Sequence, residues 1–435
     1  MSALTGNAIA VPGALTMPER YEQTQVLAVA IILFIAAPAI GTLPIIPGGV
    51  PTLTSLAAVL LFIAIRRSSS VFRLPSFLAT ALAFILLGTH TLLWSRSTFA
   101  NIAEVSLRVA ILVPIFLLAG VTLGQQESRV LDRTIGVALT IIGVAIASTI
   151  WFSETTFAAH RVAMGRVLAS AFIVVALSPL RLGIRLPASA VLFLGLLSSG
   201  SRGAFLFGSF AVLTVTLLRA GLSVRKFFAI QIGIFIVIQQ LAGTLFDAQE
   251  TIVTILSSRS GEKSADVAFR QAQSLNLKDM LSSPSSTVRT DETFAPAIDQ
   301  FWDHPFTGVG MATGVSPRRE SYVYAHNFLL ESASSVGIFG IVGAFLVIVY
   351  LGRYVVLDRN DMPVFAGLAI FAVLTSLVSG NIAINRELWL MLGVAYARLA
   401  DRSAMPRLTP LASATAAGDE PRLQRWSDRQ RLAER

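Results

Sequence analysis

The sequence predicts an all-α protein, a polytopic transmembrane helical bundle of about twelve spans. Hydrophobic residues make up 54% of the 435-residue chain and charged residues only 14%, and the mean hydropathy is +0.70. A soluble domain usually carries about 25% charged residues, so an ordinary core could not hide this much apolar surface. The apolar runs are continuous rather than alternating, which favours spanning helices over spanning strands.

Most of the apolar runs are long enough for a helix that crosses the roughly 30 Å hydrocarbon layer. The second and seventh are short, so they could be re-entrant or tilted into a neighbour. The first follows a segment that is neither basic nor apolar, which favours a true span over a cleavable signal peptide. The expected spans are residues 24–46, 50–65, 75–94, 102–123, 131–152, 164–180, 186–199, 203–220, 227–246, 326–352, 361–380 and 385–400.

The connections between the runs differ in charge, and this difference predicts their sides. Lys and Arg gather in alternate short connections and in the segment after the last span. By the positive-inside rule, these basic connections face the cytoplasm. The basic residues of the short connections are Arg66, Arg67, Arg73, Arg129, Arg133, Arg181, Arg185, Arg219, Arg225, Lys226, Arg353 and Arg359.

The resulting organisation places one large hydrophilic segment on the non-cytoplasmic side. Residues 1–23 form a cytoplasmic N-terminal segment, and residues 401–435 form a basic cytoplasmic tail. Spans one to nine occupy residues 24–246, and spans ten to twelve occupy residues 326–400. The large, partly helical loop between spans nine and ten is residues 247–325.

Several kinds of chemistry have no sequence signature here. The chain has no Cys, which excludes disulfides and thiolate nucleophiles, and its four His are too scattered to predict a metal site. The net charge of +9 reflects cytoplasmic Lys and Arg rather than nucleic-acid binding. Ion-coupled transport needs more ionisable groups near the midplane. Glu104 and Arg108, four residues apart on one helix face, fit a local ion pair.

Several basic residues are expected at the outer ends of spans or in the outer loop, namely Arg166, Arg202, Arg289 and His326. Arg202 lies in the turn Ser201-Arg202-Gly203 between two apolar runs. Its side chain could extend to phospholipid head groups. The same turn would also bring backbone amides together with a guanidinium whose fork matches phosphate oxygens. At this point both interpretations stay open.

The end of the large loop predicts an amphipathic helix that covers an apolar surface, followed by a turn at Pro305 and Gly308-Val309-Gly310. Such a helix close to lipid is suited to cap a groove, and ordinary packing on the bundle is compatible with this role. His326 lies where the polar loop becomes apolar, so it is a structural residue or a general base. The spaced apolar residues after Arg289 are Phe294, Ala297, Ile298, Phe301 and Trp302.

Residues 197–204, with their Ser-Arg-Gly turn, form the first of three short motifs. Residues 304–310 form a Pro-x-x-Gly-x-Gly turn after a loop helix, and residues 326–331, followed by 336–340, carry His-Asn-x-x-Leu at the start of a span. In order, spacing and topology, these motifs resemble the O-antigen ligase and polymerase family of bacterial envelope glycosyltransferases. The resemblance covers roughly residues 160–345.

The resemblance implies an inner-membrane enzyme whose active site faces the periplasm. It would move a glycan from an undecaprenyl-diphosphate carrier to an acceptor sugar hydroxyl, on the lipid A core or another glycan. It implies no metal and no nucleotide sugar. The expected partners are the lipid-linked donor, the acceptor and membrane lipids, and no nucleic acid is expected.

The expected catalytic residues combine guanidiniums with one imidazole. Arg202 and Arg289 would stabilise the departing diphosphate, and His326 would orient or deprotonate the acceptor hydroxyl, which favours inversion. Asp291, Glu292 and Asp303 are alternative bases. The expected substrate-binding residues are Arg166, Asn327, Ser201 and Tyr324.

Two other functions stay open. A polymerase of the same family would differ only in its acceptor, a second lipid-linked repeat unit. A flippase or transporter of a lipid-linked substrate would require a polar path across the midplane.

Overall fold

The computed structural model is all-helical wherever it describes the chain, which confirms the predicted all-α class. The chain divides into two compact units, Met1–Arg398 and Leu399–Arg435, and the candidate site lies in the first. The described residues are 99–125, 128–152, 161–199, 201–221, 293–311, 325–379 and 385–404, with Val29, Ala30, Ile32, Leu86, Leu87, Thr89, His90, Leu93, Ser95, Lys226, Ala229 and Thr313 as single positions.

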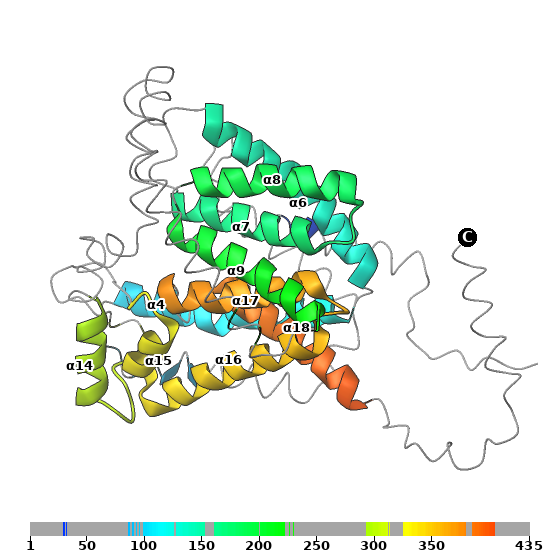
Figure 1. Cartoon of the computed structure of the whole chain (residues 1–435). Helices are drawn as coiled ribbons and strands as arrows, with labels where there is room; N and C mark the ends of the chain where they lie inside the picture. The colour runs from blue at the N-terminus through cyan, green and yellow to red at the C-terminus, as the bar shows by residue number, and fades with distance from the viewer. Residues whose placement is uncertain are drawn as a thin grey trace, which may run out of the picture. The chain divides into compact units, whose positions relative to one another are not determined.

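The described helices follow the predicted spans closely (Figure 1). They are α4 (Phe99–Leu107), the π-helical segment η2 (Arg108–Leu112), α5 (Val113–Gly124), α6 (Ser128–Phe152), α7 (Arg161–Leu177), α8 (Leu182–Ser198), α9 (Arg202–Arg219), α14 (Ala295–Asp303), α15 (Phe328–Val336), α16 (Ile338–Asp358), α17 (Pro363–Ser379) and α18 (Arg386–Ala404).

Two helices in the described part of the chain are long and apolar enough to cross a membrane. By length and composition, Asn101–Gly124 and Ile338–Asp358 could each cross a membrane. Shorter apolar helices cover Met164–Leu177, Leu182–Leu196, Gly203–Arg219 and Pro363–Val378. The predicted spans 24–46, 50–65, 75–94 and 227–246 lie wholly or largely outside the described residues, so the number of spans stays a prediction.

The predicted tenth span, residues 326–352, needs correction. Instead of one helix the structure has α15 and α16, which meet at Gly337. Gly337 has a φ of 69°, a left-handed conformation that ends α15 and that side-chain-bearing residues rarely adopt. The apolar helix long enough to cross a membrane therefore begins at Ile338, and His326 precedes a separate short helix.

A local change of helix type interrupts the predicted fourth span. The backbone N–H of Val113 donates to the carbonyl of Arg108, a π-type bond, at the end of η2. Pro114 follows at the start of α5 and has no N–H to donate to the preceding turn. The wider π turn accommodates this missing donor without ending the helix.

Close glycine contacts establish how the helices run. Gly165 near the start of α7 lies against Ser201, just before α9. Gly367 near the start of α17 lies against Leu177 at the end of α7 and Val215 near the end of α9. Helices α7 and α9 therefore run in the same direction, and α17 runs against both.

Further glycine contacts place the remaining helices. Gly195 near the end of α8 lies against Ala147 near the end of α6, and α6 packs on α7 in the opposite direction, with Gly136 against Ser178. Gly124 at the end of α5 lies against Ala397 of α18. The ring centroids of Phe328 and Trp389 are 6.1 Å apart, which joins α15 to the start of α18.

One end of the bundle, which we call the site end, therefore collects the starts of α4, α7, α9, α16 and α18 together with α15. The other end, which we call the basic end, carries Arg181, Arg219, Arg353 and Arg359. The Arg359 Nε donates to the Leu218 carbonyl oxygen at 3.0 Å and ties the α16–α17 turn to the end of α9. The described connections predicted to be outer and inner thus lie at opposite ends, while the side of the membrane stays a prediction.

Candidate functional site

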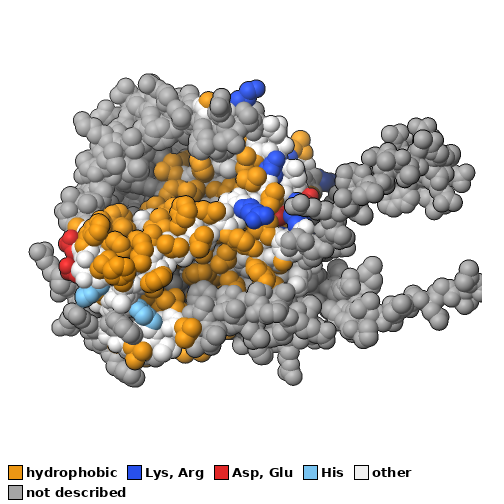
Figure 2. All heavy atoms as spheres, turned by 90° about the horizontal axis from the view of Figure 1, so that it is seen from below, with side chains coloured by type: hydrophobic (Ala, Val, Ile, Leu, Met, Phe, Trp, Pro, Cys, Tyr) orange, Lys and Arg blue, Asp and Glu red, His pale blue; other side chains and the backbone are white. Residues whose placement is uncertain are grey.

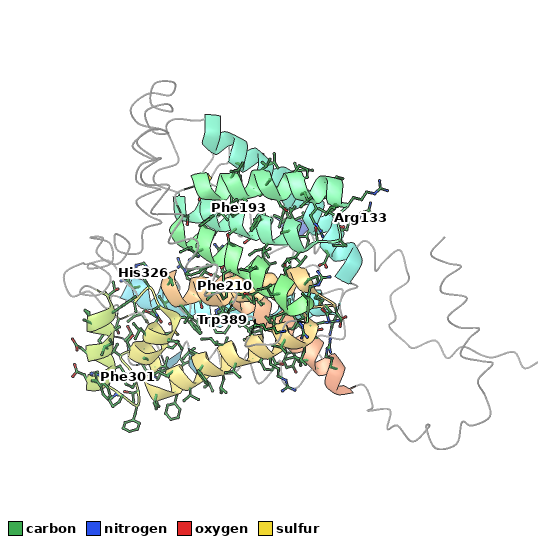
Figure 3. The ribbon with its side chains drawn as sticks, in the orientation of Figure 1. Arg133, Phe193, Phe210, Phe301, His326 and Trp389 are labelled. Carbon is green, nitrogen blue, oxygen red and sulfur yellow. The ribbon has the colours of Figure 1, made fainter. Side chains whose placement is uncertain are left out.

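His326 lies at the site end in an unusual backbone conformation (Figure 3). Its φ is 54°, and no other non-glycine residue in the described ranges has a positive φ. Such a conformation costs roughly 1–2 kcal/mol for a residue with a side chain. Strain of this kind persists only where the surrounding structure enforces it, and it is concentrated at functional sites.

Asn327 fixes the chain directly after His326. Its Oδ1 accepts hydrogen bonds from the backbone N–H groups of Leu329, at 2.9 Å, and Leu330, at 3.1 Å. This N-cap satisfies amides that the first turn of a helix leaves without partners. The structure therefore gives Asn327 a structural role, and substrate binding by the same side chain stays a prediction.

Glu331 fixes the chain directly before His326, and the sequence analysis did not select it as a site residue. Its side chain is only 3% exposed, and its Oε2 accepts a 2.9 Å hydrogen bond from the Ala325 N–H. The signal was present in the sequence, since an ionisable residue inside an apolar run is expensive unless it has partners. Asn327 and Glu331 together hold His326 from both sides.

The turn of residues 304–310 docks onto the end of α15. The Val309 N–H donates to the Ser334 carbonyl oxygen at 2.9 Å, and the Gly310 N–H donates to that of Ser335 at 3.0 Å. In return, the Ile338 N–H donates to the Pro305 carbonyl oxygen at 2.7 Å. Two of the motifs found in the sequence are thereby joined by backbone hydrogen bonds.

Glycine is required where these two segments meet. Gly308 has a φ of 65°, and a methyl group in place of its hydrogen would collide with the backbone of Ser335. Gly337 has a φ of 69°, and a methyl group there would meet the backbone of Pro305 and Phe306. Both the conformation and the close approach therefore exclude a side chain.

Helix α14 leads into this turn and only partly agrees with its predicted role. Ala297 is buried, as expected for a residue that covers an apolar surface. Ile298 and Trp302, which the same prediction placed against the bundle, are instead exposed. Asp303, an alternative base, is the last residue of α14 and is exposed.

The remaining motif lies at the same end of the bundle. Ser201 precedes the first residue of α9 and packs against Gly165, next to Arg166. Its side chain does not cap the helix, and the first turn of a helix has backbone amides without partners inside the helix. An uncapped N-terminus with a positive dipole end favours an anion.

Several predicted site residues cannot be placed. Arg202 begins α9, but its side chain lies outside the described residues, and the same holds for the whole of Arg289 and Tyr324. The alternative bases Asp291 and Glu292 also lie outside them. The structure thus brings His326, Asn327, Ser201 and Arg166 to one end of the bundle, and the meeting of His326 with the predicted arginine pair stays a prediction.

Comparison with known protein families identifies a match. A protein-family model described as O-antigen ligase matches residues 187–345. The matched range contains most of α8, all of α9, α14 and α15, and the start of α16, together with the motifs of the site end. No curated protein and no solved structure matches the chain.

Proposed function

We propose that this chain, whose residues 187–345 match the O-antigen ligase family model, transfers a glycan from an undecaprenyl-diphosphate carrier to an acceptor sugar hydroxyl on the periplasmic side of the inner membrane. The family match and the apolar helices support a glycosyltransferase-like membrane protein in general. The donor, the acceptor and the mechanism are our proposal.

The observation that carries the proposal is the strained backbone of His326 between two fixed neighbours. The Asn327 cap after His326 and the Glu331–Ala325 hydrogen bond before it enforce a conformation that is costly for a residue with a side chain. If this residue had only a structural role, glycine would adopt the same conformation at a lower cost in free energy. The imidazole is therefore the reason for a histidine here.

The chemistry that we propose is a direct displacement at the anomeric carbon. The acceptor oxygen forms the new bond to this carbon, and the bond from the carbon to the diphosphate oxygen breaks. His326 accepts the hydroxyl proton as general base, which is suited to an imidazole near neutral pH. The diphosphate leaves on the lipid carrier, and the anomeric configuration inverts.

The leaving diphosphate requires stabilisation as its charge develops. We assign this role to Arg202 and Arg289, since guanidinium forks match phosphate oxygens. The uncapped first turn of α9 supports the assignment for Arg202, because backbone amides and the helix dipole favour an anion at the same place. Arg166 and Ser201 would bind the substrate beside them, and no metal is required.

The test is glycan transfer by the purified protein in liposomes with lipid-linked glycan, candidate acceptors and EDTA. We expect His326→Ala and Arg202→Ala to remain in the membrane and to lose transfer. Removal of one donor to a developing anion costs about 3 kcal/mol, or about a hundredfold in rate. Arg353→Ala is the matched control, because Arg353 is exposed at the basic end. Normal transfer by either site variant would remove that residue from the mechanism.

The acceptor decides between ligase and polymerase. If the protein is a ligase, a strain without it accumulates long polymer on the lipid carrier. If it is a polymerase, the same strain accumulates single repeat units instead. Unchanged carrier-linked glycans on the periplasmic side would contradict both activities, and their retention on the cytoplasmic side would favour a flippase.

A further inference from the structure

Exposed aromatic side chains cluster beside the site without belonging to it. Trp302 at the end of α14, Phe306 in the docked turn and Phe339 in the first turn of α16 are each 71% exposed, and Ile298, one helical turn before Trp302, is 42% exposed. The Ile338–Pro305 hydrogen bond keeps these segments side by side. Large apolar side chains exposed together mark a contact surface. We call Ile298, Trp302, Phe306 and Phe339 the aromatic patch.

The aromatic patch continues into the exposed face of α16. Val342, Phe345, Leu346 and Val349 are all exposed on this helix, which is long and apolar enough to cross a membrane. Figure 2 shows hydrophobic side chains gathered across this face of the molecule, with acidic side chains at one edge and basic side chains at the other. The patch therefore lies at one end of a lipid-facing stripe.

The uncharged part of α16 is shorter than the hydrocarbon layer is thick. No charged residue occurs in α16 between Ile338 and Arg353, a distance of about 22 Å at the helical rise per residue. The hydrocarbon layer is about 30 Å thick. The long side chain of Arg353 reaches outward at the basic end. At the site end, the aromatic patch supplies the missing apolar surface.

The outer edge of the patch is polar. Asp299 and Asp303 are exposed on α14 next to Ile298 and Trp302. Carboxylates exclude deep burial in hydrocarbon, whereas Trp and Phe beside polar groups are typical of the layer where head groups meet acyl chains. The carboxylates also favour zwitterionic over anionic lipid.

We propose that the aromatic patch lies in the interfacial layer of the bilayer and holds the 304–310 turn at the membrane surface. The turn is bonded to Ser334, Ser335 and Ile338, so the depth of the patch also sets the depth of α15 and of His326. A lipid-linked diphosphate would present its reacting bond at the same level. The patch contacts lipid whether or not His326 is catalytic.

Trp302 provides the measurement. The full-length protein is placed in phosphatidylcholine liposomes, and the emission of Trp302 is taken as the difference between the unchanged protein and Trp302→Phe. Quenchers are phosphatidylcholines brominated near the head-group end or near the methyl end of the acyl chain, and aqueous iodide. The matched control is Trp389→Phe, because Trp389 is buried against Phe328.

We expect Trp302 to be quenched at least about twofold more by bromine near the head group than by bromine near the methyl end, since interfacial side chains lie only about 5–10 Å deep. Iodide should quench it weakly, and Trp389 should be shielded from iodide. Adding Phe339→Trp to Trp302→Phe should restore the same lipid quenching.

Either of two results would overturn the proposal. Strong iodide quenching without lipid quenching would place Trp302 in water. Protection from both quenchers would show that protein, from a second copy or another chain, covers the patch. Neither result would bear on the proposed role of His326, which is tested by glycan transfer alone.

Discussion

His326 combines a costly backbone conformation with neighbours that enforce it. The Asn327 side chain and the Glu331 carboxylate each bind backbone N–H groups within a few residues of the imidazole. Charge-assisted hydrogen bonds to a buried carboxylate are among the stronger ones in proteins. Glu331 is therefore best described as a positioning residue, which acts on the chain that carries His326.

Glu331→Ala should lower both stability and transfer. The change leaves the buried Ala325 N–H without its carboxylate acceptor, a loss of about 1–3 kcal/mol in the free energy of unfolding. Glu331→Gln keeps an acceptor oxygen at the same place, so this variant should lose less stability and less transfer activity than Glu331→Ala. The measurements are thermal unfolding in detergent and the rate of glycan transfer. If Glu331→Ala matched the unchanged protein in both, the carboxylate would have no positioning role.

The contact between the 304–310 turn and the end of α15 requires glycine for two reasons, a positive φ and the close approach of backbone atoms. A second glycine in the chain has only the first requirement and serves as a control. Gly308 has a left-handed φ and backbone neighbours in close contact. Gly221 has a φ of 73° and nothing within 4 Å of the place where a side chain would begin.

Gly308→Ala should therefore be more harmful than Gly221→Ala. Both changes carry the conformational cost of roughly 1–2 kcal/mol. Only Gly308→Ala adds overpacking, which typically costs a further 1–3 kcal/mol or so. Thermal unfolding compares the two, and transfer should fall for Gly308→Ala alone. Equal effects would show that the turn does not need its close approach to Ser335.

The packing of α5 on α18 depends on small residues spaced four apart. Gly120 and Gly124 lie against Leu390, Gly393 and Ala397, and a methyl group at Gly120 would collide with the Leu390 carbonyl oxygen. Small residues at this spacing let membrane helices approach closely. Gly343 of α16 has nothing within 4 Å and serves as the control.

Gly120→Leu should separate α5 from α18, and Gly343→Leu should be tolerated. The first change forces backbone apart and should remove several °C from the unfolding midpoint, since about 1–3 kcal/mol is typical for overpacking. The second adds apolar surface to a face that we expect to contact lipid. Unfolding midpoints in detergent give the comparison, and a destabilised Gly343→Leu would contradict the lipid-facing assignment of α16.

The break between α15 and α16 could not be predicted from the apolar pattern. Residues on both sides of Gly337 are largely apolar, and glycine is frequent inside membrane helices. Helix α15 ends at Gly337, and the docked turn packs at this break, where its Pro305 carbonyl oxygen accepts the Ile338 N–H. Such a contact joins residues distant along the chain, so local propensity does not reveal it.

The whole bundle separates a site end from a basic end, and the absence of Cys from the chain makes this separation easy to test. Thr307 is exposed at the site end, and Asn360 is exposed at the basic end. In intact cells, a membrane-impermeant maleimide should label Thr307→Cys and should not label Asn360→Cys. After the cells are opened, both should react. Labelling of Asn360→Cys alone in intact cells would place the site in the cytoplasm and contradict the proposed reaction.

The sequence predicted the helical class, the bounds of most described helices and the three motifs. This was possible because hydrophobic periodicity and charge distribution are local properties of the chain. The family match over residues 187–345 agrees with the resemblance that those motifs carried. The motifs also singled out Ser201, His326 and Asn327, whose roles in the reaction stay predictions.

The fold itself settled the contacts between distant segments. It joined the 304–310 turn to α15, gave Asn327 a capping role, and revealed Glu331 as the buried partner of Ala325. It also turned Ile298 and Trp302 outward. These features depend on contacts between backbone groups and side chains that are distant in sequence. The free energy of such tertiary contacts cannot be inferred from the local pattern of any one segment.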